Sequence, residues 1–211
     1  MITLYRHPLS GHAHRVELML SLLKLEYNLV DVDLIKGAQK HPKFVTKNPF
    51  GHVPVFGQVP VLEDGDAVLW DSIAILIYLA RTYGNDSWLP ENPVEEAKVT
   101  PWLAVAAGKI AFGPAAARLV NVFGAGLDQE NAINIANDLL GVMNGVLAES
   151  LFLAGDVPTI ADVAAYSYIA KAPEGDVSLR PFPVVEAWLS RIEALDGFVP
   201  MQSTKVGLKA V

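Results

Sequence analysis

Residues 50–72 constrain the fold of this chain more than any other part of its sequence. They contain two Val-Pro pairs, the apolar run Val61-Leu62, the dipeptide Asp64-Gly65 and a second apolar run that ends at Trp70. Proline fixes its own φ angle and pushes the preceding residue toward extended geometry, and Asp-Gly between apolar runs is typical of a tight β-hairpin. The sequence therefore predicts a strand entered through proline, a turn, a second strand and a helix that begins at Asp71-Ser72.

The two Val-Pro pairs belong to a six-residue near-repeat, in which residues 50–55 are followed by the similar residues 56–61. This unit occurs only twice and is too short for a solenoid repeat, so it indicates a local duplication. Only Val59-Pro60 is contiguous with the strand residues. We therefore expect the first copy to form a lengthened loop, and Val59 to offer a backbone edge that can pair with an extended peptide.

Upstream of the hairpin, strand-like and helix-like segments alternate. Residues 2–5 and 27–32 have strand character, residues 13–25 carry apolar side chains at helical spacing, and residues 42–47 form a short helical or irregular piece. A strand, a helix and a second strand make a parallel pair through a right-handed crossover, and the hairpin adds an antiparallel pair. With a helix over residues 72–83, the order βαβαββα predicts a thioredoxin-like domain.

Two prolines within the sequence Trp-Leu-Pro-Glu-Asn-Pro at residues 88–93 interrupt this pattern and indicate a linker. The remainder is helical in character, and Thr159 with Asp162 forms a capping box that marks one helix start. The expected helices span residues 94–107, 115–123, 128–151, 159–170 and 184–195. The fold class that follows is an α/β thioredoxin-like domain over residues 1–84, a linker over 85–92 and an all-α helical domain over 93–211.

Composition excludes several classes of function. The formal charge of −7 and the lack of a Lys and Arg cluster argue against nucleic acid or an anionic membrane as a partner. The chain has no cysteine, which excludes disulfides, thiolate zinc sites and redox chemistry by its own sulfur. The apolar stretch 102–127 is interrupted by Lys109, Pro114 and Arg118, unlike a membrane-spanning helix. No signal peptide is visible, so we expect a cytoplasmic protein.

Four motifs carry a resemblance to a known family. They are Asn48-Pro49-Phe50-Gly51 followed by Gln58-Val59-Pro60, the pair Asp71-Ser72, the capping box at Thr159, and Leu4-Tyr5 through Ser10. With them the chain resembles the cytosolic glutathione S-transferase family along nearly its whole length, and its N-terminal motif resembles bacterial serine-type, theta- and phi-like members. The resemblance implies a homodimer that uses glutathione as co-substrate, without a permanently bound cofactor or a metal.

The resemblance also implies how the chain would bind glutathione. Ser72, at a helix N-terminus that favours anions, would hold the γ-glutamyl carboxylate, and Asp71 the ammonium group. Val59 would pair with the cysteinyl backbone if Pro60 is cis. The alternative for Asp71 and Ser72 is that they only cap the helix.

Side chains on either side of the duplicated segment complete the expected glutathione site. Gln39 and Lys40 align with positions where related classes carry His and Lys, and Gln58 belongs to the motif that ends in the proline. The alternative for Gln39 and Lys40 is a solvated surface that also includes His41 and Lys43. The expected glutathione-binding set is therefore Gln39, Lys40, Gln58, Val59, Pro60, Asp71 and Ser72.

Thiol activation requires a donor aimed at sulfur, because a free thiol has a pKa of about 8.5. Ser10 precedes the first helix, and the resemblance aligns it with the serine of theta- and phi-like enzymes. It could instead be a helix cap. Tyr5 is the alternative activator, although its place in a strand favours packing, and His12 could assist Ser10. The cluster of His7, His12 and His14 lacks a third-ligand spacing and does not predict a metal site.

The resemblance implies a second substrate that lies over the sulfur, a small hydrophobic electrophile or a peroxide. Ala106, Ile110 and Phe112 could line its site or belong to the core. Phe50 or Phe56 could anchor a dimer. The predicted activity is glutathione S-transferase, with peroxide or disulfide reduction as side activities. The competing hypothesis is a non-catalytic glutathione-binding or protein-interaction module on the same fold.

Overall fold

The structure is a computed structural model that describes residues 1–33 and 59–210. Several predictions fall outside these residues. They are the short helical piece at 42–47, the lengthened loop, the residues His41 and Lys43, the two anchor candidates Phe50 and Phe56, and the site residues Gln39, Lys40 and Gln58.

A four-stranded mixed sheet forms one side of the molecule, as predicted. Its strands are β1 (Ile2–Arg6), β2 (Tyr27–Asp31), β3 (Val61–Asp64) and β4 (Ala67–Trp70), in the order β2-β1-β3-β4. Strand β1 pairs with β2 in parallel, whereas β1 with β3 and β3 with β4 are antiparallel. The Asp64-Gly65 turn joins β3 to β4, and Gly65 adopts a φ of 57° there, which glycine tolerates. The predicted hairpin is confirmed.

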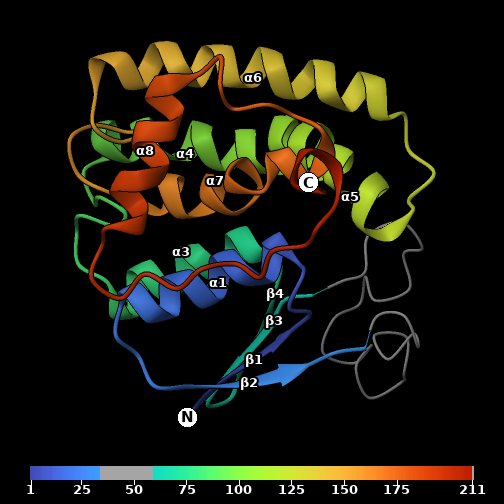
Figure 1. Ribbon diagram of the computed structural model, residues 1–211. Coiled ribbons are helices and arrows are strands. Elements are labelled where there is room, and N and C mark those ends of the chain that lie inside the picture. Colours follow the sequence, from blue (N-terminus) through green and yellow to red (C-terminus); the bar gives the residue numbers. More distant parts are fainter. Residues whose placement is uncertain (34–58, 211) are drawn as a thin grey trace.

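Two helices pack between this sheet and the remaining helices (Figure 1). They are α1 (Gly11–Leu22), which connects the parallel strands, and α3 (Ser72–Tyr83), which follows the hairpin. Helix α1 begins two residues earlier than expected, because Ser10 caps it and so makes Gly11 its first residue. It also ends at Leu22 rather than at residue 25, because Lys24 adopts a φ of 55° that stops the helix.

The second half of the chain is helical, as predicted. Its elements are α4 (Pro93–Val105), the π-helix η3 (Ala106–Ala115), α5 (Ala116–Phe123), α6 (Gln129–Glu149), α7 (Ile160–Ala170), the short 3-10 helix η4 (Ala172–Gly175), α8 (Pro183–Glu193) and the short η5 (Gly207–Lys209). Helix α6 lies across the far side of α4 and α7 from the sheet, and the chain after α8 runs along α1 toward α5 (Figure 1).

The prediction of separate helices at 94–107 and 115–123 was wrong. The structure has one uninterrupted helical run from Pro93 to Phe123, with π geometry over Ala106–Ala115. Pro114 has no N–H and would clash with the turn before it in an α-helix, whereas the wider π turn accommodates it. Gly108 and Gly113 also lie in this segment, so its sequence looked like a break between two helices.

The run Pro93–Phe123 is, within the described part of the chain, the one helix long and apolar enough to cross a membrane. The mean hydropathy of its most apolar window is 1.4, and 50% of that window is buried inside the protein. The core helix of a protein outside membranes has the same length and apolar composition. The run is therefore weak evidence for a membrane span.

The capping box at the start of α7 forms as predicted and reaches further into the core. Asp162 accepts the Thr159 backbone N–H at 2.9 Å, while Thr159 Oγ1 accepts the N–H of Ala161 at 3.2 Å. The same carboxylate accepts the indole N–H of Trp188 at 2.9 Å, which ties α8 to α7. Burial raises the pKa of Asp162 despite these bonds.

Helices α1 and α7 join the two halves of the molecule. One continuous buried cluster contains apolar side chains of both halves, such as Leu18 of α1 and Ile169 of α7. The Tyr168 ring lies directly against Gly11, where any side chain would meet it. His14 contacts Ser167 Oγ at 2.8 Å and the Val199 carbonyl oxygen at 3.0 Å.

We expect Gly11→Ala to destabilise the protein by about 1–3 kcal/mol, the range for overpacking a close-packed contact. A Cβ on Gly11 would lie 2.7–2.9 Å from three carbons of the buried Tyr168 ring, which cannot move aside cheaply. Chemical denaturation measures the free energy of unfolding. The matched control is Gly141→Ala in α6, where a Cβ meets no atom; it should stabilise by up to about 1 kcal/mol. Equal effects of the two changes would contradict the close contact.

His14 should make stability depend on pH. Burial lowers the pKa of His14 to about 4, so the folded protein keeps it neutral while the unfolded chain protonates near pH 6.5. Its contribution is complete above pH 6.5 and is lost as the pH falls toward 4, about 3 kcal/mol in total. Denaturation between pH 7 and 4 should show a shallower dependence of the unfolding free energy on pH for His14→Asn than for the parent. Parallel pH profiles for His14→Asn and the parent would refute this assignment.

Candidate active site

Three separate segments meet at one end of the sheet. They are the turn before α1 with Ser10, the Val59-Pro60 pair before β3, and the Asp71-Ser72 pair before α3. The Val59-Pro60 peptide bond is cis, as the resemblance implied. His12 Nδ1 lies 3.5 Å from Ser72 Oγ, so the N-termini of α1 and α3 are close together. The strand register thus places the described candidate residues at the same end of the sheet, and His12 and Ser72 are in direct contact there.

Ser10 lies at the N-cap of α1. Its Oγ accepts the backbone N–H of Ala13 at 3.3 Å, and its own N–H donates to the His7 carbonyl oxygen at 2.9 Å. The helix-cap alternative is therefore realised. The cap bond uses only a lone pair of the hydroxyl oxygen, so the hydroxyl proton remains available to a ligand.

A buried ion pair holds the turn that carries Ser10. Arg118 of α5 donates from Nη1 to the carbonyl oxygen of Leu9 at 2.8 Å and from Nε to Glu174 at 2.8 Å, and both charged side chains are almost fully buried. Glu174 also accepts the N–H and hydroxyl of Thr204. Burial alone would raise the pKa of Glu174, but the Thr204 and Arg118 contacts lower it. The role of Arg118 in holding this turn was not predicted from the sequence. A single arginine in an apolar helix predicts that an acceptor pairs with it, but the sequence does not show which residue that is.

Asp71 and Ser72 make different contacts: Asp71 caps helix α3, and Ser72 binds a side chain of α1. Asp71 Oδ1 accepts the N–H groups of Ile73 and Ala74 at 2.9 and 3.0 Å, which makes Asp71 the N-cap of α3. Its φ of 73° is unusual for a residue with a side chain, although aspartate tolerates it better than most. Ser72 is 4% exposed, and its Oγ accepts a hydrogen bond from Arg15 Nη1 at 3.3 Å. The cap role therefore exists, and it leaves the second Asp71 oxygen outside the two cap bonds.

The three clustered histidines diverge from one another. The ring of His7 contacts Phe123, that of His12 contacts Tyr168, and that of His14 faces Ser167. Burial and the nearby Arg15 charge lower the pKa of His12 to about 3, so its imidazole is neutral. Among the residues that the structure describes, no group of His, Asp and Glu side chains is arranged to hold a metal ion.

Tyr5, the alternative thiol activator, lies within the sheet. Its hydroxyl donates to Glu63 Oε2 at 2.8 Å across β1 and β3, and the residue packs against the buried cluster of Ala13, Val32, Val59 and Val61. These contacts are the packing role that its position in a strand favoured.

The three residues considered for the electrophile site differ in exposure. Ala106 and Ile110 are fully buried in the core, whereas Phe112 is 60% exposed. Of the three residues considered for the electrophile site, only Phe112 can meet a ligand.

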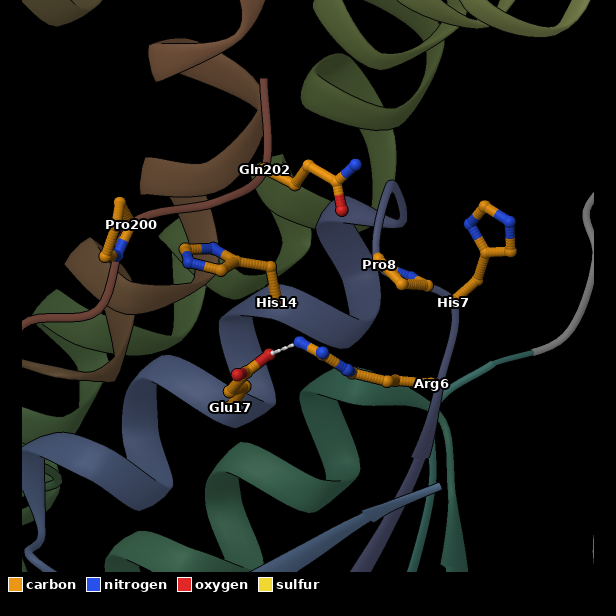
Figure 2. Close-up of a pocket in the computed structure, with 7 residues that line it drawn as sticks. All are labelled: Arg6, His7, Pro8, His14, Glu17, Pro200 and Gln202. Carbon is orange, nitrogen blue, oxygen red and sulfur yellow. Dashed lines mark hydrogen bonds and ion pairs between the residues drawn. The ribbon is translucent and has the colours of Figure 1, made fainter. Parts of the chain in front are cut away.

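A polar cavity of about 230 Å³ opens on the other face of α1 (Figure 2). Its walls are Arg6, His7 and Pro8 at the end of β1, His14 and Glu17 of α1, and Pro200 and Gln202 of the C-terminal segment. Arg6 forms an ion pair with Glu17 and a second one with Asp31 at 3.1 Å. At helical spacing His14 and Glu17 lie opposite His12 and Arg15, so α1 separates this cavity from the Ser72 side.

Comparisons with known proteins identify the family of the chain. The model of the glutathione S-transferase N-terminal domain matches residues 1–81, and that of the C-terminal domain matches residues 124–196. Glutathione S-transferase 3 of Zea mays is 35% identical, over 93% of this chain and 91% of the relative.

Solved structures of similar proteins have the same fold. A glutathione S-transferase from Pseudomonas fluorescens has a TM-score of 0.85 and 31% identity, over 96% of this chain and 99% of that chain. A glutathione transferase homologue from Drosophila mojavensis with bound glutathione has a TM-score of 0.81 and 29% identity, over 92% and 88%. Both family models and the full-length relatives lead to one conclusion: the chain belongs to the cytosolic glutathione S-transferase family and is a transferase enzyme.

Proposed function

We propose that this transferase binds glutathione across the N-termini of α1 and α3 and activates its thiol through Ser10. The observation that carries this proposal is the geometry of the Ser10 hydroxyl, whose oxygen accepts the Ala13 N–H while its proton remains available. A hydrogen bond from that proton to sulfur favours the thiolate and lowers the thiol pKa. The thiolate then adds to the electrophile.

The γ-glutamyl end of glutathione fits the start of α3. Asp71 already accepts the N–H groups of Ile73 and Ala74, so a carboxylate would be received by the Ser72 hydroxyl, favoured by the dipole of the helix N-terminus. Asp71 is exposed and would hold the ammonium group with the oxygen that the cap bonds leave. Val59, preceding the cis bond, would pair with the cysteinyl backbone. Gln39, Lys40 and Gln58 stay proposals for the rest of the ligand.

We infer a hydrophobic second substrate, because the exposed Phe112 ring belongs to the helical half. Family membership favours catalysis over the non-catalytic binding module. It also supports a cytoplasmic location.

The division into two domains is also part of the proposal. Its predicted boundaries at residues 84 and 93 fit the loop between α3 and α4.

We further infer a homodimer. Apolar side chains are exposed on the two elements that follow the hairpin turn and at the start of α4, namely Val68, Trp70, Ile77, Tyr83 and Val94. Exposed apolar residues on neighbouring elements are typical of a subunit interface.

Ser10→Ala should lower kcat/KM with 1-chloro-2,4-dinitrobenzene by about 10- to 100-fold, the value of a hydrogen bond to a charged group. The pKa of bound glutathione, followed by thiolate absorbance, should rise by about 1–2 pH units. Because alanine also removes a helix cap, Ser10→Gly provides a second variant with only a few tenths of a kcal/mol of cap loss. Ser190→Ala, at an exposed position of α8, is the control. Unchanged turnover in both Ser10 variants would exclude this role.

Sedimentation should give twice the chain mass of 22.8 kDa at micromolar concentration. A charge at Ile77, whose side chain is exposed on α3, should produce monomers, because burying an unpaired carboxylate in an interface is costly. We therefore expect Ile77→Glu to sediment as a monomer and Leu208→Glu, on the C-terminal segment, as a dimer. A monomeric parent protein would contradict the inferred assembly.

A further inference from the structure

Arg15 is an unusual residue in the second turn of α1. Its side chain is 1% exposed, although arginine is rarely buried unless a carboxylate pairs with it. Among the described residues no carboxylate lies within ion-pair distance of its guanidinium. The buried Arg118, by contrast, has Glu174 as its partner.

Two contacts fix the Arg15 guanidinium. Nη1 donates to Ser72 Oγ at 3.3 Å, and the group lies over the Tyr168 ring at 5.8 Å from the ring centroid. Nε and Nη2 are buried and have no hydrogen-bond partner in the described part of the chain. The side chain thus carries a full charge with one neutral acceptor and one ring face to stabilise it.

A buried charge of this kind is costly to the folded protein. Burial lowers the pKa of Arg15 to about 10, although Tyr168 and Asp71 act in the opposite direction. The guanidinium therefore stays charged at neutral pH. A buried charge without an acidic partner favours the binding of an anion nearby, and within residues 1–33 and 59–210 Arg15 reaches the candidate site through its hydrogen bond to the Ser72 hydroxyl.

We propose that Arg15 is a positioning residue for glutathione, which orients the Ser72 hydroxyl and supplies the counter-charge to the γ-glutamyl α-carboxylate. This inference rests on the proposed function. Because the Arg15 N–H occupies a lone pair of Ser72 Oγ, the Ser72 proton points elsewhere, toward His12 Nδ1 at 3.5 Å or toward an arriving carboxylate. Ser72 lies between the guanidinium and the proposed ligand site. Arg15 therefore acts on the ligand through the Ser72 hydroxyl and through the electrostatic attraction of its positive charge.

The test compares two ligands and three variants by calorimetric titration. The ligands are glutathione and 4-aminobutanoyl-cysteinylglycine, which differs from it only in lacking the α-carboxylate. Arg15→Met should bind glutathione at least 10-fold more weakly and bind the analogue within about 2-fold of the parent, because its loss falls on the carboxylate. Arg15→Lys keeps a charge, so its affinity for glutathione should lie between that of Arg15→Met and that of the parent. Arg180→Met, at an exposed arginine, should change neither affinity.

Thermal unfolding separates this role from a structural one. Replacing an unpaired buried charge by an apolar side chain of similar size is often neutral or stabilising, so Arg15→Met should unfold at or above the temperature of the parent. Equal weakening of both ligands would overturn the proposal, as would unchanged glutathione affinity. If Arg15→Met does not fold, Arg15→Lys decides the question. The proposal then requires that Arg15→Lys weakens the binding of glutathione more than the binding of the analogue. A parent protein that does not bind glutathione would instead refute the proposed function itself.

Discussion

Helix α1 is enclosed on nearly every side, and this enclosure determines how the rest of the chain packs. Nine of its twelve residues are buried, between the sheet beneath it and α7 and the C-terminal segment above it. A helix buried all round has no solvent face for its polar groups. Each polar side chain that α1 carries must therefore find a partner in another element, and those partners fix the relation of the two halves of the molecule.

The burial of α1 also determines the charge states of its side chains near the candidate site. His14 is held neutral between Ser167 of α7 and the Val199 carbonyl. Arg15 is held charged between the Ser72 hydroxyl and the ring of Tyr168, which also belongs to α7. Arg118 reaches from α5 to the Leu9 carbonyl, so the turn that presents Ser10 depends on a residue more than a hundred positions away. The candidate site is consequently a product of the contact between both halves.

Local signals were strong enough to predict much of this structure. The Asp-Gly turn, the capping box at Thr159 and the helix start at Ser72 are short-range features, and they formed where the sequence indicated. The prediction failed where residues are individually ambiguous. Glycines and Pro114 suggested a break between two helices, yet packing against α6 and α7 keeps one run continuous through a π segment.

The sequence by itself determined the fold class, the family and the identity of the motif residues, because turn chemistry, capping and hydrophobic period act over a few residues. It named Ser10, Asp71 and Ser72 as candidates but could not place Arg15 or Arg118 beside them. Only the tertiary structure decided that α1 and α3 bring their N-termini together, that Tyr5 is used within the sheet, and that one guanidinium is paired while the other is not. Burial and charge pairing depend on neighbours distant in sequence, which no local pattern specifies.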